Sequence, residues 1–129
     1  MKLPYVLLTL AYCAGIFWLS SQQIVLSPEL IFPGQDKLVH MILFGGLAAV
    51  VSTGLRRSGR EVPPVAQFYV PVVFAAVYGL SDEIHQLFVP TRSFDLADVL
   101  ADVLGAFLVQ WILCFRAWRI PVRAVFPGK

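Results

Sequence analysis

Charged residues are scarce in this sequence: they make up 14% of its 129 residues, whereas 58% of the residues are hydrophobic. An ordinary soluble domain has about 25% charged residues, and its helices carry polar faces that the apolar runs of this chain lack. We therefore expect lipid, and not water, to surround most of the chain. The net charge of +2 is too small, and the basic residues are too poorly interleaved with aromatic ones, to predict a nucleic-acid partner.

The motifs of common enzyme classes are also missing. The sequence has no glycine-rich phosphate loop, no GxSxG nucleophile motif and no HExxH zinc motif. Its two cysteines, Cys13 and Cys114, lie inside apolar runs and form no CxxC pair, which indicates buried thiols and not a metal or redox site. Any chemistry must therefore come from polar residues that belong to no standard motif.

Four apolar runs are present, and each is close to the ~20 residues that cross the hydrocarbon core of a membrane. They span residues 3–20, 37–55, 66–87 and 94–115. No small-x-small cleavage site follows the first run, so we interpret it as an uncleaved helix and not as a signal peptide. Pro28, Pro33 and Gly34 interrupt regular structure after it, and Asp36 is the predicted N-cap of the second helix. The sequence thus predicts an all-α polytopic membrane protein, with one domain of four transmembrane helices over residues 1–129.

The basic residues are distributed unevenly around these four helices. Eight of the ten would share one side of the membrane: Lys2, Arg56, Arg57, Arg60, Arg116, Arg119, Arg123 and Lys129. Seven of the eight acidic residues fall toward the other side. The positive-inside rule then places both termini in the cytoplasm and the acidic residues at the extracytoplasmic face.

Three aspartates share one face of the fourth predicted helix. At about 100° per residue, Asp95, Asp98 and Asp102 fall within about 60° of one another, and Gly105 continues the stripe. Asp95 could be an N-cap, and Asp98 could be a first-turn acid that the helix dipole favours. Asp102 lies about 10 Å into the helix, so its carboxylate needs a partner, a proton or a cavity. We predict that these aspartates bind a metal ion or a proton.

The third predicted helix ends in a second polar group. Asp82 and Gln86 lie one turn apart on one face. His85 lies to one side of them, and Glu83 points about a quarter-turn away. Carboxylates at the C-terminal end of a helix oppose its dipole, so simple capping does not explain them. They could mark the membrane–water interface, or they could carry out acid/base chemistry or hold a divalent cation.

Basic side chains can reach the same place from two other segments. Lys37 and His40 are one turn apart at the outer end of the second helix, and Arg92 follows shortly after Pro90. Lys37 could simply snorkel to the interface, and His40 could either hydrogen-bond a facing carboxylate or act as a general base. Arg92 could balance the aspartates or receive a phosphate or carboxylate. We assign structural roles, as points of close helix approach, to three glycines: Gly45, Gly79 and Gly105.

One pattern of these residues runs through nearly the whole chain. It comprises Asp36-Lys37-Leu38-Val39-His40 with Phe44-Gly45, then Tyr78-Gly79, Asp82-Glu83 and Gln86, then Arg92-Ser93, Asp95, Asp98 and Gly105. The end of the first run, Trp18-Leu19-Ser20-Ser21-Gln22, belongs to the same pattern. This pattern resembles the VanZ-like family of small bacterial membrane proteins, although that family usually has asparagine where this chain has Asp102. The resemblance implies a multi-pass protein of the bacterial cytoplasmic membrane and cell envelope. The family is named for a protein linked to resistance to glycopeptides such as teicoplanin, and the resemblance supplies no reaction.

Three functions are compatible with these residues. In the first, the extracytoplasmic site binds or processes a lipid-linked or anionic envelope molecule, with Lys37, Gln86 and Arg92 as substrate-binding residues. A hydrolase or transferase of this kind could use a divalent cation and would have four candidate catalytic residues: His40, Asp82, Glu83 and Asp98. In the second, the helices form a non-catalytic drug-binding, lipid-binding or structural bundle. The third is a proton- or ion-coupled transporter, for which an oligomer could provide the pathway.

Overall fold

The computed structural model describes residues 1–22 and 34–119 of the chain. Its regular structure consists of four helices: α1 (Leu3–Ser20), α2 (Gln35–Arg56), α3 (Pro64–Gln86) and α4 (Leu96–Arg119). The described residues contain no strand, and each helix is long and apolar enough to cross a membrane. The predicted all-α fold with four membrane-spanning helices is therefore confirmed. Pro28 and Pro33, predicted to interrupt regular structure, and Arg123 and Lys129, two of the eight basic residues predicted to share one side, lie outside the described ranges.

The start of α2 differs from the prediction. The helix begins at Gln35, two residues early, and Gly34 occupies the N-cap position with a left-handed backbone (φ 87°) that glycine adopts without strain. The prediction that Asp36 is the N-cap is thus wrong. Asp36 lies instead in the first turn, where the helix dipole favours a carboxylate.

The other helix ends follow from local chemistry. α3 begins at Pro64, two residues before the predicted start, because proline fits the first turn, where its missing N–H is not needed. At the start of α4, Asp95 Oδ1 accepts a hydrogen bond from the Ala97 N–H at 2.8 Å, which is an N-cap contact. α3 ends at Gln86, and α4 extends to Arg119, four residues beyond the predicted end.

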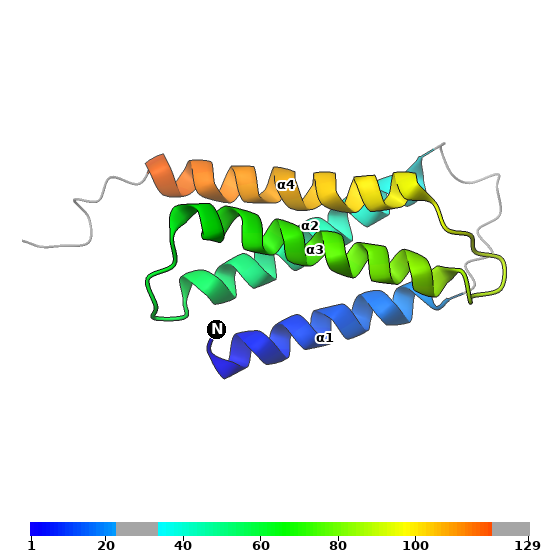
Figure 1. The fold of residues 1–129 in the computed structure, drawn as a ribbon, viewed down its shortest axis with the longest axis horizontal. Coiled ribbons are helices and arrows are strands. Elements are labelled where there is room, and N and C mark those ends of the chain that lie inside the picture. Colours follow the sequence, from blue (N-terminus) through cyan, green and yellow to red (C-terminus); the bar gives the residue numbers. More distant parts are fainter. Residues whose placement is uncertain (23–33, 120–129) are drawn as a thin grey trace, which may run out of the picture.

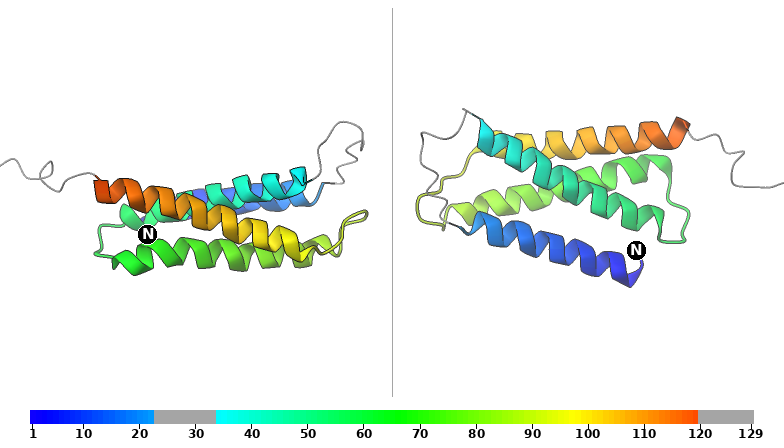
Figure 2. Two further views of the ribbon diagram at one scale, coloured as in Figure 1. Left: turned by 90° about the horizontal axis from the view of Figure 1, so that it is seen from above. Right: turned by 180° about the vertical axis from the view of Figure 1, so that it is seen from behind.

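The four helices alternate in direction along one long axis (Figure 1). α2 is inclined across the bundle, so that it begins beside the start of α4 and ends beside the start of α1 (Figure 2, right). α2 packs most extensively against α4, α3 contacts both of them, and α1 contacts α2 and a small part of α3. The ends of α1 and α3 therefore meet the starts of α2 and α4. We call this end of the bundle the polar end; it holds Ser20, Lys37, Gln86 and Asp95.

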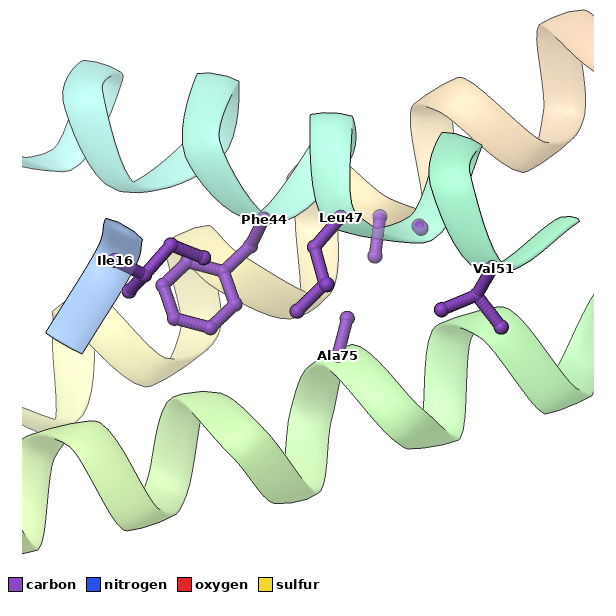
Figure 3. Close-up of a cluster of buried hydrophobic side chains, with 7 residues drawn as sticks. Ile16, Phe44, Leu47, Val51 and Ala75 are labelled. Carbon is purple, nitrogen blue, oxygen red and sulfur yellow. The ribbon is translucent and has the colours of Figure 1, made fainter. Parts of the chain in front are cut away.

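The core lies between the middles of the helices. Leu47 of α2 points toward Ala75 of α3, Val51 lies further along the same side of α2, and Ile16 of α1 lies beside the ring of Phe44 (Figure 3). Gly45 of α2 and Gly105 of α4 let the backbones of these two helices approach closely, which is how helices pack where lipid removes the usual hydrophobic drive. Large apolar side chains are exposed on the outside of all four helices, as expected of surfaces that face lipid.

Candidate functional site

Most of the buried polar side chains of the bundle lie at or near the polar end. They are Ser20, Asp82, Glu83, Gln86, Asp98 and Asp102. They come from α1, α3 and α4, and α2 adds Lys37 and His40. Burying polar groups among apolar helices is costly unless they are paired, so the partners of each side chain define what this end of the molecule can do.

His40 and Asp102 form a buried pair. His40 Nδ1 lies 2.9 Å from Asp102 Oδ1, and the Asp102 side chain has no exposed surface. The carboxylate fits because it packs against Gly79, where an added Cβ would meet it. Asp102 was predicted to need a partner because it lies deep in its helix, and His40 is that partner. A carboxylate at Nδ1 fixes the orientation of the ring and turns Nε2 toward α3.

Glu83 lies where Nε2 points. Its Oε2 accepts a hydrogen bond from the backbone N–H of Asp95 at 2.9 Å, which ties the end of α3 to the start of α4. Its Oε1 lies 3.9 Å from His40 Nε2, too far for a hydrogen bond. Among the described residues, this buried oxygen has no hydrogen-bond partner. One oxygen of the Glu83 carboxylate is thus structural, and the described part of the chain leaves the other without a hydrogen bond.

Lys37 lies at the centre of three carboxylates. Its Nζ is 2.9 Å from Asp36 Oδ2, 3.0 Å from Asp95 Oδ2 and 3.0 Å from Asp98 Oδ1. The Lys37 ammonium, aided by the Ala97 N–H, holds the pKa of Asp95 below its usual value. Asp95 therefore stays charged at neutral pH, and its contribution to stability is lost only as the pH falls through that lowered pKa. Snorkelling alone does not describe Lys37, because three acids fix it.

Asp82 joins α3 to α1. Its Oδ1 accepts a hydrogen bond from the Ser20 hydroxyl at 2.6 Å, and its Oδ2 accepts one from Gln86 Nε2 at 3.3 Å. Ser20 was not among the predicted site residues, because a serine near a helix end usually bonds its own backbone, as Ser20 also does here. His85 lies apart from the acids, with its ring against Phe17 at 4.3 Å between centroids.

Arg92 lies at the rim of a cavity of about 390 Å³ at the polar end. The turn before it has Pro90 at its second position and Thr91 at its third, with φ 70° at Thr91, which is the pattern of a type II turn. The apolar wall of the cavity includes Ile16, Leu19, Val39, Leu43 and Phe44. Its polar lining includes Ser20, Asp36, His40, Asp82, Gln86 and Arg92. Arg92 forms no ion pair with any described residue.

Two groups of side chains have the composition of a cation site. One is Asp36 with Asp95 and Asp98, and the other is His40 with Glu83 and Asp98. The Lys37 ammonium lies within 3.0 Å of all three acids of the first group, so that group already holds a cation. The predicted set of Asp95, Asp98 and Asp102 does not converge on one point, since Asp102 faces His40 and Asp95 faces Lys37.

The remaining predicted residues lie where helices cross. Gly45 and Gly105 face each other across α2 and α4, and a Cβ at Gly45 would be 3.1 Å from the Gly105 carbonyl oxygen. Gln110 was not singled out from the sequence, yet it is fully buried and donates a hydrogen bond to the Ala48 carbonyl at 3.1 Å. A glutamine inside an apolar run is itself a signal in the sequence, because it predicts a hydrogen bond to a neighbouring helix.

Comparison with known proteins gives one match. A family model described as VanZ/LLP1 matches residues 5–118. This range contains all four helices except their outermost residues, and every residue of the polar end named above. No curated protein and no solved structure is significantly similar to the chain.

Proposed function

The chain belongs to the VanZ/LLP1 family and has four helices apolar enough to cross a membrane, and from this premise we propose that it binds a lipid-linked anionic molecule of the bacterial cell envelope at its polar end. The protein lies in the cytoplasmic membrane with both termini inside, and the polar end faces the extracytoplasmic side. The observation that carries the proposal is the cavity, whose wall is apolar and whose rim is polar.

The distribution of apolar and polar residues in the cavity lining matches an amphiphilic ligand. The apolar wall consists of side chains from α1 and α2, such as Leu19 and Leu43, and it can cover an acyl or prenyl chain that enters from the bilayer. The polar lining lies at one end of the helices, where we expect the lipid head groups to be. A ligand with one apolar chain and one compact polar head would satisfy both parts at once.

The expected charge of the head group follows from the basic side chain at the cavity that has no acidic partner among the described residues. Lys37 is already surrounded by three carboxylates, so it is not available to a second anion. Arg92 lines the cavity without a described ion pair. Its planar guanidinium is suited to bidentate binding of a phosphate, and we therefore expect a phosphate-bearing head group.

The orientation is supported by the distribution of charge along the bundle. Arg56, Arg57 and Arg60 lie at the end opposite to the acids of the polar end. Basic residues in short loops favour the cytoplasmic side of a membrane. The polar end then opens to the leaflet in which exported lipid-linked precursors are used.

The substitution Arg92→Gln tests the binding proposal. We expect it to weaken the binding of a polyprenyl phosphate by about 10–100-fold, since a hydrogen bond to a charged group contributes about 1.5–3 kcal/mol. Folding should be unaffected, because the described Arg92 side chain takes no part in the hydrogen bonds that join the helices. Binding is measured by native mass spectrometry or by titration of the purified protein in nanodiscs of zwitterionic lipid.

Two controls sharpen this experiment. Arg60→Gln removes an exposed arginine at the opposite end and should leave the affinity unchanged. The neutral polyprenol should bind much more weakly than its phosphate to the unaltered protein. Equal affinities of the Arg92 and Arg60 variants, or equal binding of polyprenol and polyprenyl phosphate, would contradict the proposal and leave the polar residues with a purely structural role.

Labelling of single cysteines tests the orientation. In a chain with Cys13 and Cys114 replaced by alanine, Ser93→Cys lies in an exposed position at the polar end, and Arg60→Cys lies in the connection between α2 and α3 at the other end. We expect a membrane-impermeant maleimide added to intact spheroplasts to label the cysteine at 93 and to spare the one at 60. The reverse pattern would show that the polar end faces the cytoplasm.

A further inference from the structure

An unsatisfied oxygen lies at the centre of the polar end. The Glu83 side chain has no exposed surface, and its Oε1 has no hydrogen-bond partner among the described residues. Its other oxygen is held by the Asp95 backbone N–H, so the carboxylate cannot rotate to relieve Oε1 without freeing that amide. Leaving a buried charged oxygen unpaired costs more than leaving a neutral one unpaired. Such a group in a folded protein calls for an explanation, and a bound ion that completes it is one.

His40, the side chain that faces Glu83 Oε1, is oriented as a metal ligand. His40 Nε2 points toward Glu83 Oε1 at 3.9 Å, while His40 Nδ1 is bonded to Asp102. When Nδ1 carries the proton and donates it to a carboxylate, Nε2 presents a lone pair, and metal-binding histidines are commonly oriented in this way. The distance also fits, because an ion bonded at about 2.1 Å to both atoms holds them at most about 4.2 Å apart.

Asp98 supplies a third ligand. Oxygen atoms of Asp98 and Glu83 and a ring nitrogen of His40 all lie within 4.8 Å of one another. One Asp98 oxygen is bonded to Lys37 at 3.0 Å, which fixes the carboxylate on the face of α4 that points into the bundle. The three ligands come from three different helices, and all three side chains are at most 12% exposed.

We propose that the polar end holds one divalent first-row transition-metal ion, bound by His40, Glu83 and Asp98 and oriented through Asp102. One imidazole and two carboxylates form a mixed nitrogen and oxygen set that suits Zn²⁺ or Mn²⁺ better than Mg²⁺ or Ca²⁺, which prefer oxygen ligands. Such an ion offsets the negative charge of Glu83, Asp98 and Asp102, to which Lys37 supplies only one positive charge. The inference goes beyond the binding of a lipid-linked anion and does not depend on it.

Metal analysis of the purified protein tests the site directly. Protein stripped with a chelator in detergent, with no lipid ligand added, is equilibrated with Zn²⁺ or Mn²⁺, and bound metal is measured by mass spectrometry after gel filtration. We expect one ion per chain in the unaltered protein. Glu83→Gln should weaken binding by more than about 100-fold, and the positioning variant Asp102→Asn by about 10–100-fold. Asp36→Asn is the matched control, because Asp36 binds Lys37 at the same end but is exposed, and it should bind as the unaltered protein does.

A spectroscopic measurement separates ligation from a general effect on folding. Co²⁺ replaces Zn²⁺ with visible absorption bands that depend on its ligands. We expect Asp102→Asn to shift these bands, since it changes the basicity of His40, whereas Asp36→Asn should not. Should a variant fail to fold without metal, as judged by gel filtration and circular dichroism, Asp98→Asn takes its place. Absence of bound metal in the unaltered protein would overturn the proposal, and so would equal metal content in the Glu83, Asp98 and Asp36 variants.

Discussion

Replacing Gly105 by alanine is expected to destabilise the protein by at least about 3 kcal/mol, the upper end of what an overpacked core ordinarily costs. An added Cβ would meet the carbonyl oxygen, the Cα and the carbonyl carbon of Met41. These are backbone atoms, which cannot swing aside as a flexible side chain can. α2 and α4 would have to separate along the most extensive helix contact of the bundle, and the pairs of Lys37 with Asp98 and of His40 with Asp102 would separate with them.

The experiment compares three glycines in the same protein. Unfolding in mixed detergent micelles, followed by circular dichroism, gives the free energy of each variant. Gly15→Ala should be neutral or slightly stabilising, because nothing lies within 4 Å of the added Cβ and alanine is the better helix former. Gly45→Ala should fall between, since its nearest neighbours are Val109 Cγ2 at 3.0 Å and the Gly105 oxygen at 3.1 Å. If Gly105→Ala were as stable as Gly15→Ala, the close crossing of α2 and α4 would be wrong.

The predicted helices and the aspartate stripe rest on strong local constraints. A span through lipid must satisfy its own backbone hydrogen bonds, so apolar runs of this length can only be helices here. The stripe follows from the helical repeat, and it places Asp98 and Asp102 one turn apart. Lys37 and His40 are also one turn apart on α2, whose start lies beside the start of α4. Lys37 therefore pairs with Asp98, and one turn deeper in the bundle His40 pairs with Asp102.

The rotation of α3 could not be predicted in the same way. Most of α3 is apolar on all sides, so no polar face fixes which of its last residues turn inward. Only the fold shows that Glu83 is buried against His40, whereas His85 packs on Phe17. The link from Ser20 to Asp82 depends equally on how α1 lies against α3. The predicted start of α2 was wrong because Gly34, with its left-handed backbone, occupies the N-cap position that we had predicted for Asp36.

The second large effect is expected when Lys37 is replaced by methionine. This substitution keeps nearly the same side-chain length but removes the positive charge, so three carboxylates lose their shared partner and face one another. Breaking a buried ion pair costs about 3–5 kcal/mol, and here the cost is smaller because Lys37 is 36% exposed and both Asp36 and Asp95 reach solvent. We expect a loss of about 2–3 kcal/mol of unfolding free energy, measured in the presence of a chelator. Lys2→Met, which removes an exposed lysine at the opposite end, should cost almost nothing.

A double-mutant cycle identifies which carboxylate accounts for that loss. Asp98 is the least exposed of the three, at 10% of its side chain, so it depends most on the ammonium of Lys37. If that is the reason for the loss, Lys37→Met combined with Asp98→Asn should be more stable than Lys37→Met alone, with a coupling energy of at least about 1 kcal/mol. Combination with Asp36→Asn, at the most exposed partner, should give a coupling near zero. Equal couplings for the two aspartates would mean that Lys37 acts through the general field of the polar end and not through its contact with Asp98.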